Sequence, residues 1–106
     1  MSLVSRSPLP TRLKTARKAK GISQKNLGIL AGIDEFSASA RMNHYEKGKH
    51  FPDFDTLERI AKILDVPVPY FYCKDDQLAE LLVQYGRMPS EKKKKLLTFL
   101  AELETL

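Results

Sequence analysis

The sequence has no tryptophan and one cysteine, Cys73, among its 106 residues. A single cysteine excludes an intrachain disulfide, and the flanking Tyr70, Phe71 and Tyr72 favour a small core residue at this position. No apolar run approaches the roughly 18 residues that a transmembrane helix requires. The first residues also lack the apolar segment of a signal peptide. We therefore expect a reduced, cytoplasmic protein without a membrane span.

Residues suited to catalysis or metal binding are equally scarce. His44 and His50 are six positions apart, and no cysteine or carboxylate pattern completes a metal site around them. Cys73 has no motif partner for nucleophilic catalysis, and the chain contains no glycine-rich phosphate loop. We therefore expect neither an enzyme nor a bound cofactor.

Acidic residues are rare in the first half of the chain. Residues 1–50 contain ten lysines and arginines against three aspartates and glutamates, whereas residues 51–106 contain eight against ten. The net charge of +5 thus comes from the first half. This asymmetry favours a surface that binds a polyanion, with a basic surface that has no partner as the alternative.

The pattern of apolar residues and helix breakers predicts an all-α fold, because no alternating stretch is long enough for a strand. We expect helices over 9–19 and 24–31, a segment ending near 45–46, a helix that follows Asp53 as its N-cap, and a short helix at 70–72. The second helix should begin after Ser23 as N-cap and turn Leu27, Leu30 and Ala31 inward. Two further helices are expected after an N-cap at Asp75 or Asp76 and after one at Ser90, separated by Met88 and Pro89.

Two short helices joined at a glycine, the second with a basic end, describe a helix-turn-helix. Such a unit needs a small residue where the helices cross, which Gly28 provides. Its turn needs a residue that tolerates positive φ, which Gly32 provides. Four apolar residues are expected to anchor both helices to the core: Leu27, Ile33, Met42 and Tyr45.

The chain resembles the Cro/C1-type helix-turn-helix regulators over roughly residues 9–72. The stretches that carry the resemblance are "RLKTARKAKGISQKNLGILAGI" and "MNHYEKGKHFPDFDTLERIAKILDVPV". They combine "SQ" at the start of the second helix, "LAGI" at the turn and "YEKGK" at the end of the third. The resemblance implies a five-helix, lambda-repressor-like DNA-binding domain, for which we take residues 9–73.

The resemblance also implies roles for individual residues. Arg17 would pair with Glu46 beneath the binding face, with two separately solvated charges as the alternative. Gln24 would bind a DNA phosphate, assisted by the N–H groups that begin its helix. Further phosphate contacts would come from Asn43, Lys47 and Lys49. Base edges in the major groove would be read by Ser39, Ala40, Arg41 and His44.

One departure from the family concerns the segment between Ile33 and Tyr45, which is four residues longer than usual, about one helical turn. Either the turn is longer or the recognition helix starts earlier. We favour a longer turn, "DEFS", with Ser37 or Ser39 as N-cap. The small residues at 37–40 would let the helix approach the bases closely; the alternative is that they relieve crowding around the inserted turn.

Outside this domain, residues 1–8 are expected to form a flexible arm and residues 74–106 a helical hairpin. The hairpin carries an apolar stripe that either folds back on the domain or, as we favour, forms a homodimer: Leu78, Leu81, Leu82, Tyr85, Leu96, Leu100 and Leu103.

The expected function is sequence-specific binding of double-stranded DNA by a dimeric transcriptional repressor. A helix-turn-helix used as a protein-interaction module, such as an antitoxin or accessory protein, is the alternative. Nonspecific RNA binding is disfavoured, because no aromatic platform accompanies the basic residues.

Overall fold

The computed structural model describes residues 6–106, which contain α-helices, one 3₁₀ helix and no strand. The all-α prediction is therefore confirmed for this range. The elements in chain order are α1 (Leu9–Lys20), α2 (Gln24–Leu30), α3 (Ala38–Glu46), α4 (Phe54–Leu64), the 3₁₀ helix η1 (Val68–Tyr72), α5 (Asp76–Arg87) and α6 (Ser90–Leu103). None of these helices is long and apolar enough to cross a membrane.

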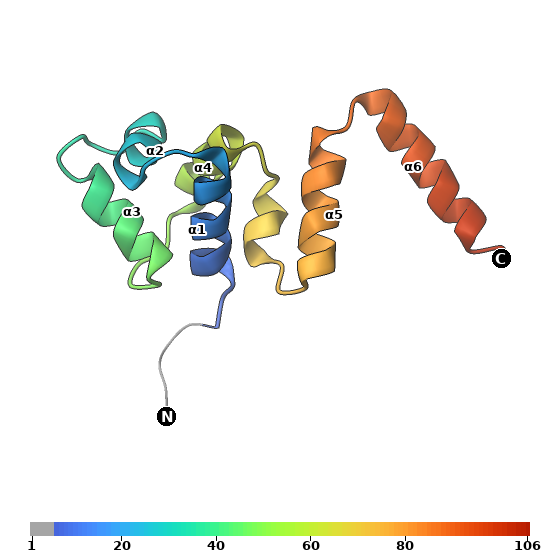
Figure 1. Cartoon of the computed structure of the whole chain (residues 1–106), viewed down its shortest axis with the longest axis horizontal. Coiled ribbons are helices and arrows are strands. Elements are labelled where there is room, and N and C mark those ends of the chain that lie inside the picture. The colour runs from blue at the N-terminus through green and yellow to red at the C-terminus, as the bar shows by residue number, and fades with distance from the viewer. Residues whose placement is uncertain (1–5) are drawn as a thin grey trace.

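Helices α1 to α4 and η1 enclose the core. Figure 1 shows how these helices are arranged. The four predicted anchors Leu27, Ile33, Met42 and Tyr45 are all buried. Apolar side chains of α1 and α4 contribute to this core together with two aromatic residues of η1: Leu9, Leu13, Leu57, Ile60, Leu64, Tyr70 and Phe71. Helix α5 also reaches the core, since Ala79 is buried in it and Val83 packs against it.

The inserted residues lengthen the turn between α2 and α3, as expected. Helix α3 begins only at Ala38, with Ser37 as N-cap, although the Ser37 side chain makes no capping hydrogen bond. Instead the turn is ordered by Asp34, whose carbonyl accepts a hydrogen bond from the Ser37 N–H at 2.9 Å. The recognition helix α3 is therefore nine residues long, and the inserted residues do not extend it at its start.

The crossing of α2 and α3 confirms the structural role of Gly28. A Cβ at this position would lie 2.8 Å from the Cβ of Ala38 and 3.0 Å from its carbonyl oxygen. The small side chain of Ala38 is thus required by this contact, whereas Ser39 and Ala40 are exposed. The run of small residues therefore divides into one packing position and an accessible part. Gly32, with a φ of 88°, forms the turn as predicted.

Two local predictions, on Leu30 and Ser90, need correction, and two others, on the fifth helix and Cys73, become more specific. Leu30 does not face inward but is 62% exposed, because Leu27, Gly28 and Ala31 share the buried face and Leu30 lies roughly 100° around the helix from its centre. The fifth helix is a 3₁₀ helix. Ser90 is the first residue of α6, and Pro89 is its N-cap. Cys73 is only partly buried, and its thiol donates to the Asp75 carbonyl.

The other predicted caps are present. Ser23 Oγ accepts from the Asn26 N–H at 3.0 Å, and Asp75 Oδ1 from the Gln77 N–H at 2.9 Å. Asp53 Oδ1 accepts from the Thr56 N–H at 2.8 Å, and this bond is the main reason that the pKa of Asp53 lies below its ordinary value. The Asp53 carboxylate is therefore charged at neutral pH, and its negative charge interacts favourably with the positive N-terminal end of the α4 dipole.

Helices α5 and α6 differ in how they meet the rest of the chain. The face of α5 that bears Ala79 packs on the domain, while Leu78, Leu81 and Tyr85 are exposed on the adjoining face. Helix α6 has no buried residue and diverges from α5 in Figure 1. The stripe on α6 is therefore not folded back on the domain of its own chain.

The predicted arm at 1–8 lies mostly outside the described residues. Of its last three residues, Pro8 is the N-cap of α1, and Ser7 Oγ accepts from the Leu9 N–H at 3.2 Å.

Candidate nucleic-acid interface

A buried ionic network holds the end of α3 against α1 and α2. Arg17 Nε donates to Glu46 Oε2, and Arg17 Nη2 donates to Glu46 Oε1 at 3.1 Å. The side chains of Arg17 and Glu46 are only 13% and 3% exposed. Arg17 also donates to the Ile22 carbonyl at 3.0 Å. The predicted pair is thus a bidentate bridge rather than two separately solvated charges.

Gln24 belongs to the same network. Its Nε2 donates to Glu46 Oε1 at 3.1 Å and to Asn43 Oδ1 at 3.3 Å. Because an amide nitrogen has two hydrogens, these bonds use both of them. A phosphate contact by this nitrogen would have to replace one of the two bonds.

The outward surface of α3 lies between two open grooves. We call the first the lysine groove, because its rim carries three lysines; it is lined by Lys14, Lys18, Ser23, Gln24, Asn43 and Lys47, above Arg17 and Glu46. It brings together residues from the end of α1, the start of α2 and the end of α3. The predicted phosphate residues Gln24, Asn43 and Lys47 therefore share one surface.

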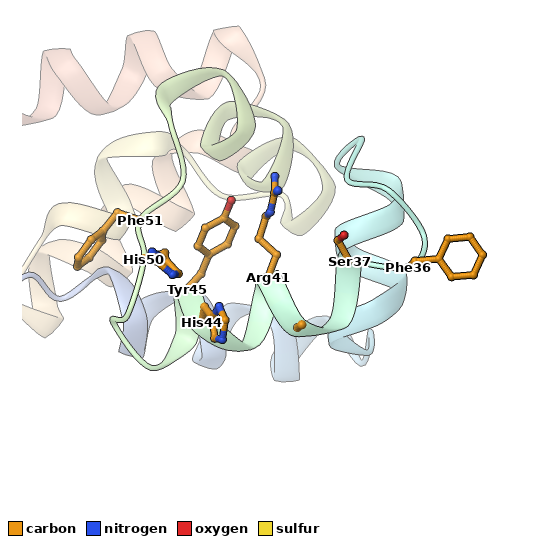
Figure 2. A pocket seen from close by; sticks show the side chains of 8 residues that line it. Phe36, Ser37, Arg41, His44, Tyr45, His50 and Phe51 are labelled. Atoms are coloured by element: carbon orange, nitrogen blue, oxygen red, sulfur yellow. The ribbon is translucent and has the colours of Figure 1, made fainter.

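The second groove, which we call the histidine groove, lies on the other side of α3. It is lined by Phe36, Ser37, Ala40, Arg41, His44, Tyr45, His50 and Phe51 (Figure 2). The rings of His44 and His50 lie 5.2 Å apart between centroids. Three of the four predicted base readers, Ala40, Arg41 and His44, are thus neighbours, whereas Ser39 lines neither groove in the described part of the chain.

Arg41 and His44 leave α3 in different directions, as Figure 2 shows. Arg41 lies near enough to Asp53 for its charge to contribute to the lowered pKa of that carboxyl, after the Thr56 hydrogen bonds and Arg59. Lys49 is exposed in the loop after α3, beyond the two grooves.

Sequence reasoning assigned no individual role to Lys14, Lys18, Phe36 or Phe51, and it did not include His50 among the DNA-binding residues. The two lysines could have been found, because positions four apart lie on the same face of a helix. No local signal places His50 beside His44, since their proximity depends on the path of the loop that follows α3.

Comparison with known proteins identifies relatives of this chain. It is 51% identical in sequence to the transcriptional regulator BswR, over 89% of this chain and 93% of that chain, and the two structures superpose with a TM-score of 0.82. It is also 40% identical over 58 residues to YqaE, an uncharacterised HTH-type transcriptional regulator of Bacillus subtilis (strain 168). That match spans 55% of this chain and 47% of YqaE. No protein-family model matches the chain.

The similarity to BswR extends over most of both chains and includes the arrangement of helices. YqaE is described as a regulator of the helix-turn-helix type. In this chain the helix-turn-helix consists of α2, the long turn that follows it and α3. The protein therefore belongs to the same family of helix-turn-helix transcriptional regulators as BswR.

Proposed function

We propose that this regulator is a dimeric repressor of the Cro/C1 type that binds double-stranded DNA sequence-specifically with α3 in the major groove. The observation that carries the proposal is the outward face of α3. Ala40, His44 and Lys47 follow one another there at i, i+4 and i+7, between two grooves that carry basic side chains. An α-helix fits the major groove of B-DNA, and flanking cations suit the phosphates on either side.

Phosphate binding and base reading fall to different parts of this surface. Lys14, Lys18 and Lys47 on the rim of the lysine groove would bind the backbone of one strand. Lys49 would add a contact from the loop after α3. Arg41 and His44 have the hydrogen-bonding groups to read base edges, and the small Ala40 lets the helix come close.

The proposed dimer uses α5 and α6. Lys93 Nζ lies 5.1 Å from the centroid of the Tyr85 ring, which holds the start of α6 beside the exposed face of α5. The apolar stripes of both helices are exposed, with Leu81 at 45% and Leu100 at 44%. An apolar surface of this extent favours association, and a two-fold dimer places one α3 in each half-site.

The proposed activity is binding rather than catalysis, and its proposed place is the cytoplasm. Selection of bound fragments from a random DNA pool tests the proposal. We expect enrichment of one two-fold symmetric sequence with half-sites about 10 base pairs apart, or a multiple of that. A pool that shows no enrichment, with affinity that hardly changes with salt, would point to a protein-interaction module instead.

Phosphate contacts are tested by the salt dependence of DNA affinity. Replacing Lys47 or Lys49 by alanine should weaken binding to all sequences alike, and each change should flatten the slope of log affinity against log salt by about 0.9. Lys74→Ala is the matched control, because Lys74 is exposed in the loop between η1 and α5, away from α3. An unchanged slope in both variants would contradict the phosphate assignment.

A further inference from the structure

The most exposed aromatic side chain of the described residues is Phe36, at 94%. It lies in the turn that the insertion lengthens, two residues before α3 begins. Its side chain projects beyond the N-terminal end of α3 (Figure 2). Full exposure of a phenylalanine keeps a large apolar area in water, which association with another apolar group would remove.

The backbone at Phe36 is held in place. Its N–H donates to Asp34 Oδ2 at 3.1 Å, so that the Asp34 side chain closes the turn. The next N–H, that of Ser37, donates to the Asp34 carbonyl at 2.9 Å. The side chain therefore extends from an ordered turn at a constant position relative to α3.

Phe36 also adjoins the residues proposed to read bases. It lines the histidine groove together with Ala40 and His44. Ala40 of this groove is exposed, and its side chain is a single methyl group. A duplex that receives this end of α3 in its major groove would therefore lie next to the exposed Phe36 ring.

A phenylalanine ring recognises apolar groups, since it has no hydrogen-bond donor or acceptor. The 5-methyl group of thymine is the apolar group that bases present in the major groove, and phenylalanine is among the residues that contact it. We propose that Phe36 determines specificity by packing against a thymine methyl group in each half-site. This inference rests on the proposed binding of DNA through α3.

The contact has a predictable size. Burying one methyl group contributes about 0.8 kcal/mol, which corresponds to about a fourfold change in affinity. Uracil keeps the hydrogen-bonding groups of thymine and lacks only the methyl group. Exchanging thymine for uracil therefore isolates this contact from every polar one.

The experiment uses the full-length chain and the sequence that it selects from the random pool. Each thymine of a half-site is replaced in turn by uracil, and affinities are measured for the wild type and for Phe36→Ala. We expect one thymine at which uracil weakens the wild type about fourfold and leaves the variant unaffected. Phe36→Ala should lose a similar factor on the thymine-containing site, and the two changes together should cost little more than either alone.

Tyr72→Ala is the control, because it also removes an exposed aromatic side chain but lies in η1. It should retain the full uracil penalty. If the wild type and Phe36→Ala show the same penalty at every thymine, or if Phe36→Ala changes only the association state, the inference is wrong while the proposed function stands. If the wild type selects no sequence, the proposed function itself fails.

Discussion

At the scale of single residues, Glu46 links three helices of the candidate interface. It accepts hydrogen bonds from Arg17 of α1 and Gln24 of α2 while it closes α3. A carboxylate that is 3% exposed requires such partners, because a buried charge without them is unstable. One side chain thereby sets the position of three helices around the lysine groove.

Replacing Glu46 by alanine should destabilise the domain strongly. The Arg17 guanidinium would remain largely buried without its counter-ion, and losing one member of such a pair costs about 3–5 kcal/mol in free energy of unfolding. Equilibrium unfolding in urea, monitored by circular dichroism, measures this loss.

The bridge between Arg12 and Asp76 provides the control for Glu46. It has an N–O distance of 2.9 Å, but the Asp76 side chain is 92% exposed. Asp76→Ala should therefore cost less than about 1 kcal/mol. Equal losses in the two variants would show that burial does not determine the strength of the Glu46 bridge.

At the scale of elements, the crossing of α2 and α3 decides how the recognition helix is presented. Gly28 and Ala38 meet there without room for another carbon atom. Arg59 of α4 supports the same unit, because its Nε donates to the Ala31 carbonyl at the end of α2 at 2.7 Å. The long turn between the helices is accommodated because both of its ends are fixed by these contacts.

Replacing Gly28 by alanine should lower the free energy of unfolding by about 1–3 kcal/mol, because the added methyl group overpacks the crossing. Urea unfolding of the variant measures the loss. Adding Ala38→Gly removes the nearest atom, so the double variant should recover part of the stability of the crossing. A Gly28→Ala variant as stable as the wild type would mean that the helices separate without cost.

At the scale of the whole molecule, the chain divides into a packed domain and an extended α6. The domain has a buried core to which α5 contributes, whereas none of the residues of α6 is buried. The Cα radius of gyration is 16.0 Å, against about 13 Å for a compact chain of this length. Helix α6 extends away from the domain in Figure 1, and this extension increases the radius of gyration.

Truncation after Arg87, or Leu100→Asp in the full chain, should yield a folded monomer. Neither change touches the core, since α6 has no buried residue. Truncation removes the α6 part of the apolar surface proposed for the dimer, and Leu100→Asp places a charge within it. Sedimentation at tens of micromolar measures the association state, and each monomer should bind one half-site and lose cooperative binding to a two-fold site.

Thr98→Asp is the matched control for Leu100→Asp, since it adds the same charge to α6 on the side away from the leucine stripe. It should remain dimeric. A wild-type chain that sediments as a clean monomer at this concentration would exclude the proposed dimer.

The sequence by itself determined the helices and their ends, because these depend on neighbouring residues. Ser23, Asp53 and Asp75 accept hydrogen bonds two or three residues further along the chain, and the apolar spacing within each helix defines its buried face. The long turn was also predictable, since an earlier start of α3 would have driven an extra helical turn into the groove.

Only the tertiary structure decided which residues share a surface. Lys14 and Lys47 line the same groove although they are far apart in the sequence. His50 lies beside His44 because the loop after α3 turns back toward the helix. The small side chain of Ala38 was predicted to let the helix approach DNA bases. In the structure it instead lets α3 pack closely against Gly28 of α2. Leu30 is exposed although its spacing suggested burial. Local spacing defines the face of a helix, but the crossing angles and loop paths of several helices determine what that face meets.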